Sequence, residues 1–115
     1  MAIRAMIDEA LRRMIASDLL VRISAGTAPT VLDVRSHREF TRGHVPGALH
    51  VPCWKLLTRA PGIPMSLDDP LVLYCGHGPR AWLAGAALRR RGFRRVEYLD
   101  GHMSRWRREG SREET

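Results

Sequence analysis

Short apolar runs alternate with segments of helical periodicity along most of the chain. Four runs have the length and the aliphatic content of strands, at residues 31–34, 48–51, 71–75 and 96–99. A weaker fifth run lies near Met14 and Ile15, followed by a short helical segment that we expect to start at Ser17, as its N-cap, and to end at Gly26. Strands that alternate with helices are typical of parallel sheets. The pattern therefore predicts an α/β fold, an open five-stranded parallel sheet with helices on both faces.

Helix boundaries are marked in two further places. Ser36 and Glu39 have the spacing of a capping box, which predicts a short helix directly after the strand at 31–34. A second helical segment starts at Cys53 and is ended by Pro61. The residues that follow, up to 70, are rich in Gly and Pro, and we expect them to form a loop that leads into the strand at 71–75.

The most strongly patterned helix follows that strand, in the segment RAWLAGAALRRRGF. Pro79 suits its first position, because the missing N–H would have no partner there. Gly92 suits a left-handed cap at its end, where Phe93 can pack back on Leu88. The side chains expected to face the core are those of Leu83, Ala84, Ala87 and Leu88.

Composition is that of one globular domain. The 115 residues are 44% hydrophobic and 27% charged, which argues against disorder along most of the chain. We expect a single domain over 1–115, with its core at about 15–108, a helical extension at 1–13 and a flexible tail at 109–115. No apolar run approaches the about 20 residues of a membrane helix, and the first residues are charged throughout, so the cytoplasm is the expected location.

The net charge of +7 comes mostly from arginine, much of it in the segments LRRRGFRR and SRWRREGSRE. Such a patch is most often a solvated helix face, but it also suits an anionic substrate, an acidic partner protein or nucleic acid. No aromatic residues alternate with these arginines as they would on a base-stacking surface, which disfavours nucleic acid. Cys53 and Cys75 are too few for a disulfide framework, and both are expected to be free thiols.

Cys75 occupies an unusual position, between a strand and the start of a helix. The carboxyl end of a strand is where open α/β sheets bind ligands. Backbone N–H groups of a tight loop and the positive end of a helix dipole stabilise an anion, and a thiolate is such an anion. Gly76 and Gly78 allow the loop to curl around one atom. The alternative is a buried structural cysteine, which is common at strand ends.

Three ordered motifs connect the chain to a known family. LDVRSHREFTRGHVPGALHVP at 32–52, YCGHGPRA at the loop and LDGHMSRW at 99–106 resemble the motifs of a single rhodanese domain, the sulfurtransferase family. The resemblance implies that Cys75 attacks the outer sulfur of a donor such as thiosulfate, holds it as a persulfide and passes it to a thiol or to cyanide. It implies no cofactor. The anion-binding loop would consist of Gly76, His77, Gly78, Pro79 and Arg80.

Two alternative functions are separated by features of this loop. Tyrosine phosphatases place five residues between Cys and Arg around a phosphate, whereas four residues separate Cys75 from Arg80, which disfavours a phosphatase. Many thiosulfate-using relatives carry a cation inside the loop, and this chain offers only His77 there. A persulfide sensor or protein-interaction module that does not turn over a small donor is therefore the second hypothesis.

The remaining candidates are supporting residues. Asp33 and Arg35 end a strand at the same edge as Cys75, and Glu39 has the i, i+4 spacing for an ion pair with Arg35. Cys53 follows another strand, which raises the hypothesis that its thiol resolves the Cys75 persulfide.

Histidines form a second group of candidates. His102 replaces the second glycine of the family's usual pair, and we interpret it as a surface residue that caps a helix rather than one that faces a ligand. His44, His50, His77 and the two cysteines lack the close spacing of a metal cluster, so no metal site is predicted.

Overall fold

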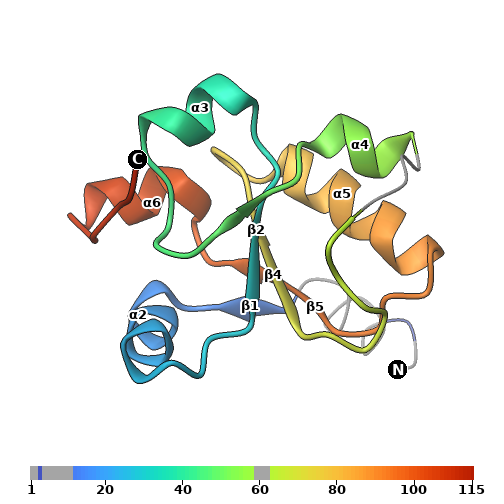
Figure 1. Cartoon of the computed structure of the whole chain (residues 1–115), viewed down its shortest axis with the longest axis horizontal. Helices are drawn as coiled ribbons and strands as arrows, with labels where there is room; N and C mark the ends of the chain where they lie inside the picture. Colours follow the sequence, from blue (N-terminus) through green and yellow to red (C-terminus); the bar gives the residue numbers. More distant parts are fainter. Residues whose placement is uncertain (1–2, 4–11, 59–62) are drawn as a thin grey trace.

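Five parallel strands form a sheet in the order β1-β5-β4-β2-β3, which confirms the predicted fold class (Figure 1). The computed structural model describes residue 3 and residues 12–58 and 63–115. Along the chain the elements are β1 (Arg13–Met14), α2 (Ala16–Ala25), β2 (Thr30–Asp33), α3 (His37–Arg42), β3 (Leu49–His50), α4 (Cys53–Leu57), β4 (Leu71–Tyr74), α5 (Pro79–Arg90), β5 (Val96–Leu99) and α6 (His102–Arg108).

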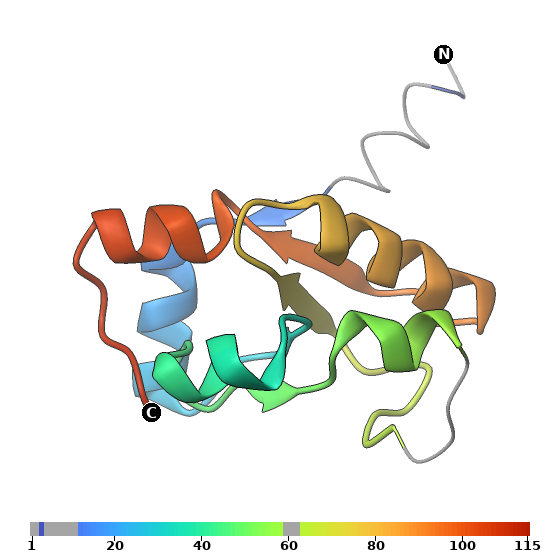
Figure 2. The ribbon, with the colours of Figure 1, turned by 90° about the horizontal axis from the view of Figure 1, so that it is seen from above.

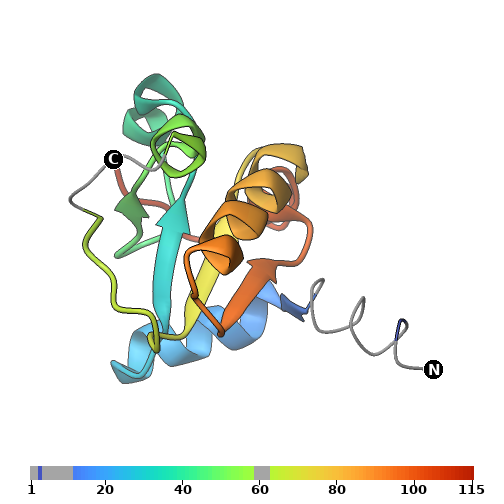
Figure 3. The ribbon, with the colours of Figure 1, turned by 90° about the vertical axis from the view of Figure 1, so that its right-hand side faces the viewer.

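Helices cover both faces of the sheet, and two hydrophobic clusters fill the space between the layers (Figure 3). Successive side chains of a strand point to opposite faces. Leu71, Leu73 and Cys75 therefore join the cluster under α4 and α5, whereas Val72 and Tyr74 join the cluster under α2 and α6. All four residues of β4 are buried, as expected for a central strand covered on both sides.

α4 and α5 lie side by side on one face of the sheet (Figure 2). This neighbourhood matters for the site, because α5 begins directly after the loop of Cys75 and α4 begins at Cys53. The Cys53 thiol donates to the carbonyl oxygen of Arg80 at 3.3 Å. Cys53 thus begins α4 and Cys75 begins the loop before α5, and these two segments meet at one edge of the sheet.

Several predicted helix ends are confirmed. Ser36 caps α3 and forms the complete capping box with Glu39. Pro79 is the first residue of α5. At the other end of α5, the Phe93 N–H donates to the Leu88 carbonyl, and the Gly92 N–H donates to the Arg89 carbonyl. These are the two hydrogen bonds of a Schellman motif, in which Gly92 has a φ of 103°.

Two local predictions are wrong. Ser17 is not the N-cap of α2: Ile15, two residues earlier, takes that position without a side-chain hydrogen bond, and the helix begins at Ala16. Leu83 was expected in the core, but 56% of it is exposed. The buried stripe of α5 consists instead of Ala81, Ala84, Gly85 and Leu88. Small residues on that stripe let α5 approach the sheet closely, and a Cβ added to Gly85 would collide with the Tyr98 ring.

The predicted extension and the predicted tail lie at the two ends of the chain. Most of the helical extension expected at 1–13 lies outside the described residues, and Arg13 belongs to β1. The tail expected to be flexible at 109–115 pairs with the loop after α3: His44 and Glu114 exchange two backbone hydrogen bonds of 2.8 Å, and the Glu114 carboxylate accepts the Gly47 N–H at 2.7 Å. Across 12–58 and 63–115, no helix has the length and apolar character needed to span a membrane.

Candidate active site

Cys75 lies one residue beyond β4, at the carboxyl edge of the sheet, where the loop turns into α5. Its sulfur accepts the Gly78 N–H at 2.9 Å. The side chain is only 1% exposed, and core side chains surround the part of it that faces away from the loop. One backbone amide therefore already points at the sulfur, as an anion cradle requires.

The loop is held from behind by the start of α6. The carbonyl oxygens of Cys75 and Gly76 accept the N–H groups of Met103 and Ser104 at 3.0 and 3.1 Å. Because these carbonyl oxygens face α6, they do not repel an anion on the sulfur side of the loop. No local sequence pattern indicates this contact, since it joins residues 28 positions apart.

Gly78 is required by both backbone geometry and packing. Its φ of 132° is a conformation that L side chains rarely adopt, and a Cβ there would lie 2.9 Å from the Trp82 ring. Trp82 itself is half exposed and stands edge-on to His102, with 6.4 Å between ring centroids. The indole thus packs over the loop at the point where the amide donates to the sulfur.

The surface position predicted for His102 is wrong. It is buried, at 5% exposure, and its Nδ1 accepts the backbone N–H of Cys75 at 3.2 Å. Burial first, and then the neighbouring His77, lowers its pKa, although Asp100 acts in the opposite direction. The neutral ring with its proton on Nε2 is the form that fits, since Nδ1 must be an acceptor. His102 has φ 53°, which explains why glycine is common at this position of the family pattern.

Arg80 is engaged by Glu39 in a two-pronged ion pair, with N–O distances of 2.6 and 3.1 Å. The hydrogen bond with Arg80, opposed by burial, lowers the pKa of Glu39 to about 2. The hydrogen bond with Glu39 likewise raises the pKa of Arg80, and the nearby Cys75 sulfur adds to the effect. The predicted pair between Glu39 and Arg35 is wrong, because Glu39 bonds Arg80 across the site.

Arg35 bonds Asp33 instead, within a buried polar network. Its guanidinium lies 2.8 Å from Asp33, which also accepts the Tyr74 hydroxyl at 2.6 Å, and Tyr74 in turn accepts the Val45 N–H at 3.0 Å. Burial alone would lower the pKa of Arg35, but the hydrogen bonds and charge of Asp33 outweigh it and raise the value. Burial and the charge of Asp33 raise the pKa of Tyr74. The network ties β2 to β4 and to the loop that carries Val45.

Cys53 and His77 complete the set of predicted site residues. Burial first, and then the charge of Cys75, raises the pKa of Cys53, so its thiol form is favoured. His77 is exposed at the tip of the loop. In the described part of the chain, no three His, Cys, Asp or Glu side chains gather in a group that could hold a metal ion.

Comparison with known proteins identifies the family of the chain. The rhodanese-like domain profile matches residues 15–109, and the chain therefore belongs to the rhodanese-like domain family. It is 35% identical over 97 residues to a sulfurtransferase of Allochromatium vinosum, a match that covers 84% of this chain and 89% of that protein. It is 36% identical over 80 residues to the thiosulfate sulfurtransferase GlpE of Ectopseudomonas mendocina, covering 67% of this chain and 69% of that protein.

Solved structures support the fold. The crystal structure of the Alr3790 protein from Anabaena sp. is similar with a TM-score of 0.78 at 29% identity, covering 88% of this chain and 81% of that one. For two other curated relatives the match spans only 39% and 45% of their length. Together, the family match and the solved structure establish a rhodanese-like domain.

Proposed function

We propose that the protein transfers sulfane sulfur from a small anionic donor such as thiosulfate to a thiophilic acceptor, through a persulfide on Cys75. The observation that carries the proposal is the 2.9 Å hydrogen bond from the Gly78 N–H to the Cys75 sulfur. It supports a thiolate and, after transfer, the negative charge of the added sulfur.

In the first step the Cys75 thiolate attacks the outer sulfur of thiosulfate. A bond forms between the two sulfurs, the sulfur–sulfur bond of the donor breaks, and sulfite leaves with the electron pair. In the second step cyanide or a thiolate attacks the outer sulfur of the persulfide, and the Cys75 thiolate is regenerated. Since Cys75 is 1% exposed, the loop must open enough for the donor to reach the sulfur.

The loop residues then have distinct roles. Gly76 and Gly78 give the loop its curvature, and Pro79 begins α5 without an unpaired N–H. Arg80, fixed by Glu39, lies next to the sulfur and supplies positive charge there. Asp33, Arg35 and Tyr74 hold the strands beneath the loop and do not touch the reacting atoms.

One observation favours the second hypothesis, a persulfide sensor or interaction module. The Arg80 guanidinium beside the sulfur is already paired with the Glu39 carboxylate through both of its terminal nitrogens, and the other basic side chain of the loop is the exposed His77. The loop therefore offers the sulfonate of thiosulfate no unpaired arginine or lysine. An acidic partner protein or a protein thiol would then deliver or remove the sulfur.

The test incubates wild type, Cys75→Ser and Cys53→Ser with thiosulfate and, separately, with cysteine persulfide, first without an acceptor and then with cyanide as the acceptor. Intact mass reports sulfur uptake, and sulfite and thiocyanate release report turnover. Uptake with turnover in wild type and Cys53→Ser, but not in Cys75→Ser, supports the enzyme. Uptake without turnover supports the sensor, and uptake by Cys75→Ser refutes both.

A further inference from the structure

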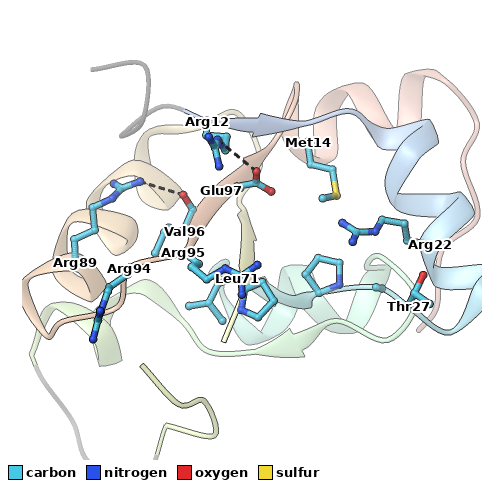
Figure 4. A pocket seen from close by; sticks show the side chains of 13 residues that line it. Arg12, Met14, Arg22, Thr27, Leu71, Arg89, Arg94, Arg95, Val96 and Glu97 are labelled. Atoms are coloured by element: carbon cyan, nitrogen blue, oxygen red, sulfur yellow. Dashed lines mark hydrogen bonds and ion pairs between the residues drawn. The ribbon is translucent and has the colours of Figure 1, made fainter. Parts of the chain in front are cut away.

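A cavity of about 280 Å³ lies at the opposite edge of the sheet from Cys75, where β2, β4 and β5 begin (Figure 4). Its apolar lining comes from Met14, Ala28, Pro29, Pro70, Leu71 and Val96. Leu71 lines the cavity, and Cys75 lies four residues further along the same extended segment, in which each residue advances the chain by about 3.3 Å. The cavity is therefore separate from the sulfur site. Its volume is close to the lower limit for small-molecule sites.

Five arginines line the cavity, against a single carboxylate, that of Glu97. They are Arg12, Arg22, Arg89, Arg94 and Arg95. Glu97 lies 3.8 Å from Arg12, a loose pair whose arginine is largely exposed. The lining therefore carries a formal charge of +4, which is strongly unbalanced for so small a space.

The arginines differ in what already engages them. Arg89 donates to the Tyr98 hydroxyl and the Val96 carbonyl, and Arg94 lies 3.9 Å from the exposed Asp68. Among the residues that the structure describes, the side chains of Arg22 and Arg95 have no hydrogen bond or ion pair. Figure 4 shows Arg22 extending from α2 toward the cavity and Arg95 beside Leu71.

Helix dipoles explain only part of this charge. Arg22 is in the last turn of α2 and Arg89 in the last turn of α5, where a cation complements the negative helix end. Arg12 and Arg95 belong to no helix, and they flank β1 and β5 at the cavity. Helix dipoles therefore account for Arg22 and Arg89, but not for Arg12 and Arg95, which line the same cavity.

We propose that this cavity binds a small organic anion, whose phosphate or carboxylate groups pair with Arg22 and Arg95 and whose apolar part packs on Met14, Pro29 and Leu71. The planar fork of an arginine matches both kinds of oxyanion with two parallel hydrogen bonds, and the guanidinium can also stack on a flat ring. The site does not depend on the persulfide chemistry of Cys75.

The test is isothermal titration calorimetry at near-physiological salt with four probes: adenosine diphosphate, citrate, inorganic pyrophosphate and adenosine. We expect adenosine diphosphate or citrate to bind with a dissociation constant below about 1 mM, tighter than pyrophosphate or adenosine, because only the first two join charge to a carbon body. Whichever of these two probes binds more tightly shows whether the cavity prefers a phosphate or a carboxylate.

Variants locate the site. The double variant Arg22→Gln, Arg95→Gln should weaken binding of the probe at least about tenfold. Glu97→Gln should strengthen its binding, because a charge of the same sign as the probe is removed. Arg108→Gln, an exposed arginine of α6 outside the cavity, is the matched control and should stay within about twofold. Circular dichroism melting confirms that each variant is folded.

Three results would overturn the proposal: none of the four probes binding below about 1 mM, adenosine diphosphate and citrate binding no tighter than pyrophosphate, or equal weakening by Arg108→Gln. Cys75→Ser should bind the probe as wild type does, and the Arg22 and Arg95 double variant should still take up sulfur. Failure of anion binding and failure of sulfur transfer are therefore seen separately.

Discussion

The Nδ1 atom of His102 accepts the backbone N–H of Cys75 at 3.2 Å, so a buried imidazole fixes the amide of the residue that we propose as the nucleophile. Residues 27 positions apart meet here because β4 and α6 both border the same loop. The interaction needs an unprotonated Nδ1, which links the order of the loop to pH.

His102 should make the protein less stable in mild acid. Burial lowers its pKa in the folded state below the ordinary value of about 6.5. The unfolded chain then binds more protons than the folded one, so stability is full above about pH 6.5 and falls as the pH drops toward the folded-state pKa. Urea unfolding of wild type between pH 7.5 and 5 should show this loss.

His102→Asn is the matched variant for that measurement. Asn tolerates φ near 53° and offers an amide oxygen to the Cys75 N–H, but it does not titrate. We expect the slope between pH 7.5 and 5 to flatten in this variant. His102→Ala leaves the buried N–H without an acceptor and should cost about 1–3 kcal/mol at pH 7.5. An unchanged slope in His102→Asn contradicts the assignment.

Gly78→Ala should disturb the loop for two reasons. The φ of 132° disfavours any side chain, and the new Cβ would contact the Trp82 ring. We expect a loss of about 1–3 kcal/mol in stability and slower sulfur uptake by mass spectrometry, because the Gly78 N–H moves away from the sulfur.

Two comparisons separate these reasons. Gly26→Ala carries the cost of positive φ, with 73°, but has no atom within 4 Å of the new Cβ and lies far from Cys75 in sequence. Its sulfur uptake should match that of wild type. Adding Trp82→Ala to Gly78→Ala removes the steric part and should restore some stability. Uptake by Gly78→Ala at the wild-type rate would show that this amide does not matter.

Glu39→Gln should remove an acid-sensitive contribution to stability. The pKa of Glu39 is about 2 in the folded state, so its ion pair with Arg80 is fully present above about pH 4.5 and is lost as the pH falls toward 2. Both side chains are more than a third exposed, and screening by solvent limits the effect at pH 7 to about 1 kcal/mol.

Acid titration followed by circular dichroism tests this expectation. The stability difference between wild type and Glu39→Gln should shrink as the pH drops from 4.5 to 2. Glu109→Gln, which breaks an exposed i, i+4 pair with Arg105 away from the loop, is the control and should change stability less. A difference that stays constant down to pH 2 argues against the pair.

Cys53 should remain a thiol at neutral pH, because burial and the charge of Cys75 raise its pKa. A thiol is a poor nucleophile, so the Cys75 persulfide should persist at pH 7 and be resolved by Cys53 only as the pH rises. Resolution would join the two cysteine sulfurs and release the outer sulfur as hydrosulfide, with no added oxidant.

Non-reducing peptide mapping and sulfide release follow this reaction. After persulfide loading, the bridged fraction should increase from pH 7 to pH 9.5 in wild type and be absent in Cys53→Ser. Rapid bridging at pH 7 would make Cys53 an efficient resolving thiol, contrary to this prediction. Absence of a bridge at every pH would show that the sulfurs cannot meet.

Local sequence patterns determined much of the fold. The structure confirms the strands expected from the apolar runs, the capping box at Ser36, and the boundaries of α5 at Pro79 and Gly92. Each of these features depends on residues that are neighbours in sequence. The motif around Cys75 likewise placed this residue at a strand end before a helix, because glycine spacing and a helix start are local properties.

Tertiary structure decided what depends on distant segments. Glu39 bonds Arg80 rather than Arg35, because α3 and α5 flank the same edge and Asp33 already holds Arg35 within the core. His102 is buried because α6 packs against the loop, and the tail pairs with the segment at His44. Sequence periodicity reports which side of an element is apolar, but not which element covers it, so these partners emerge only when the layers are assembled.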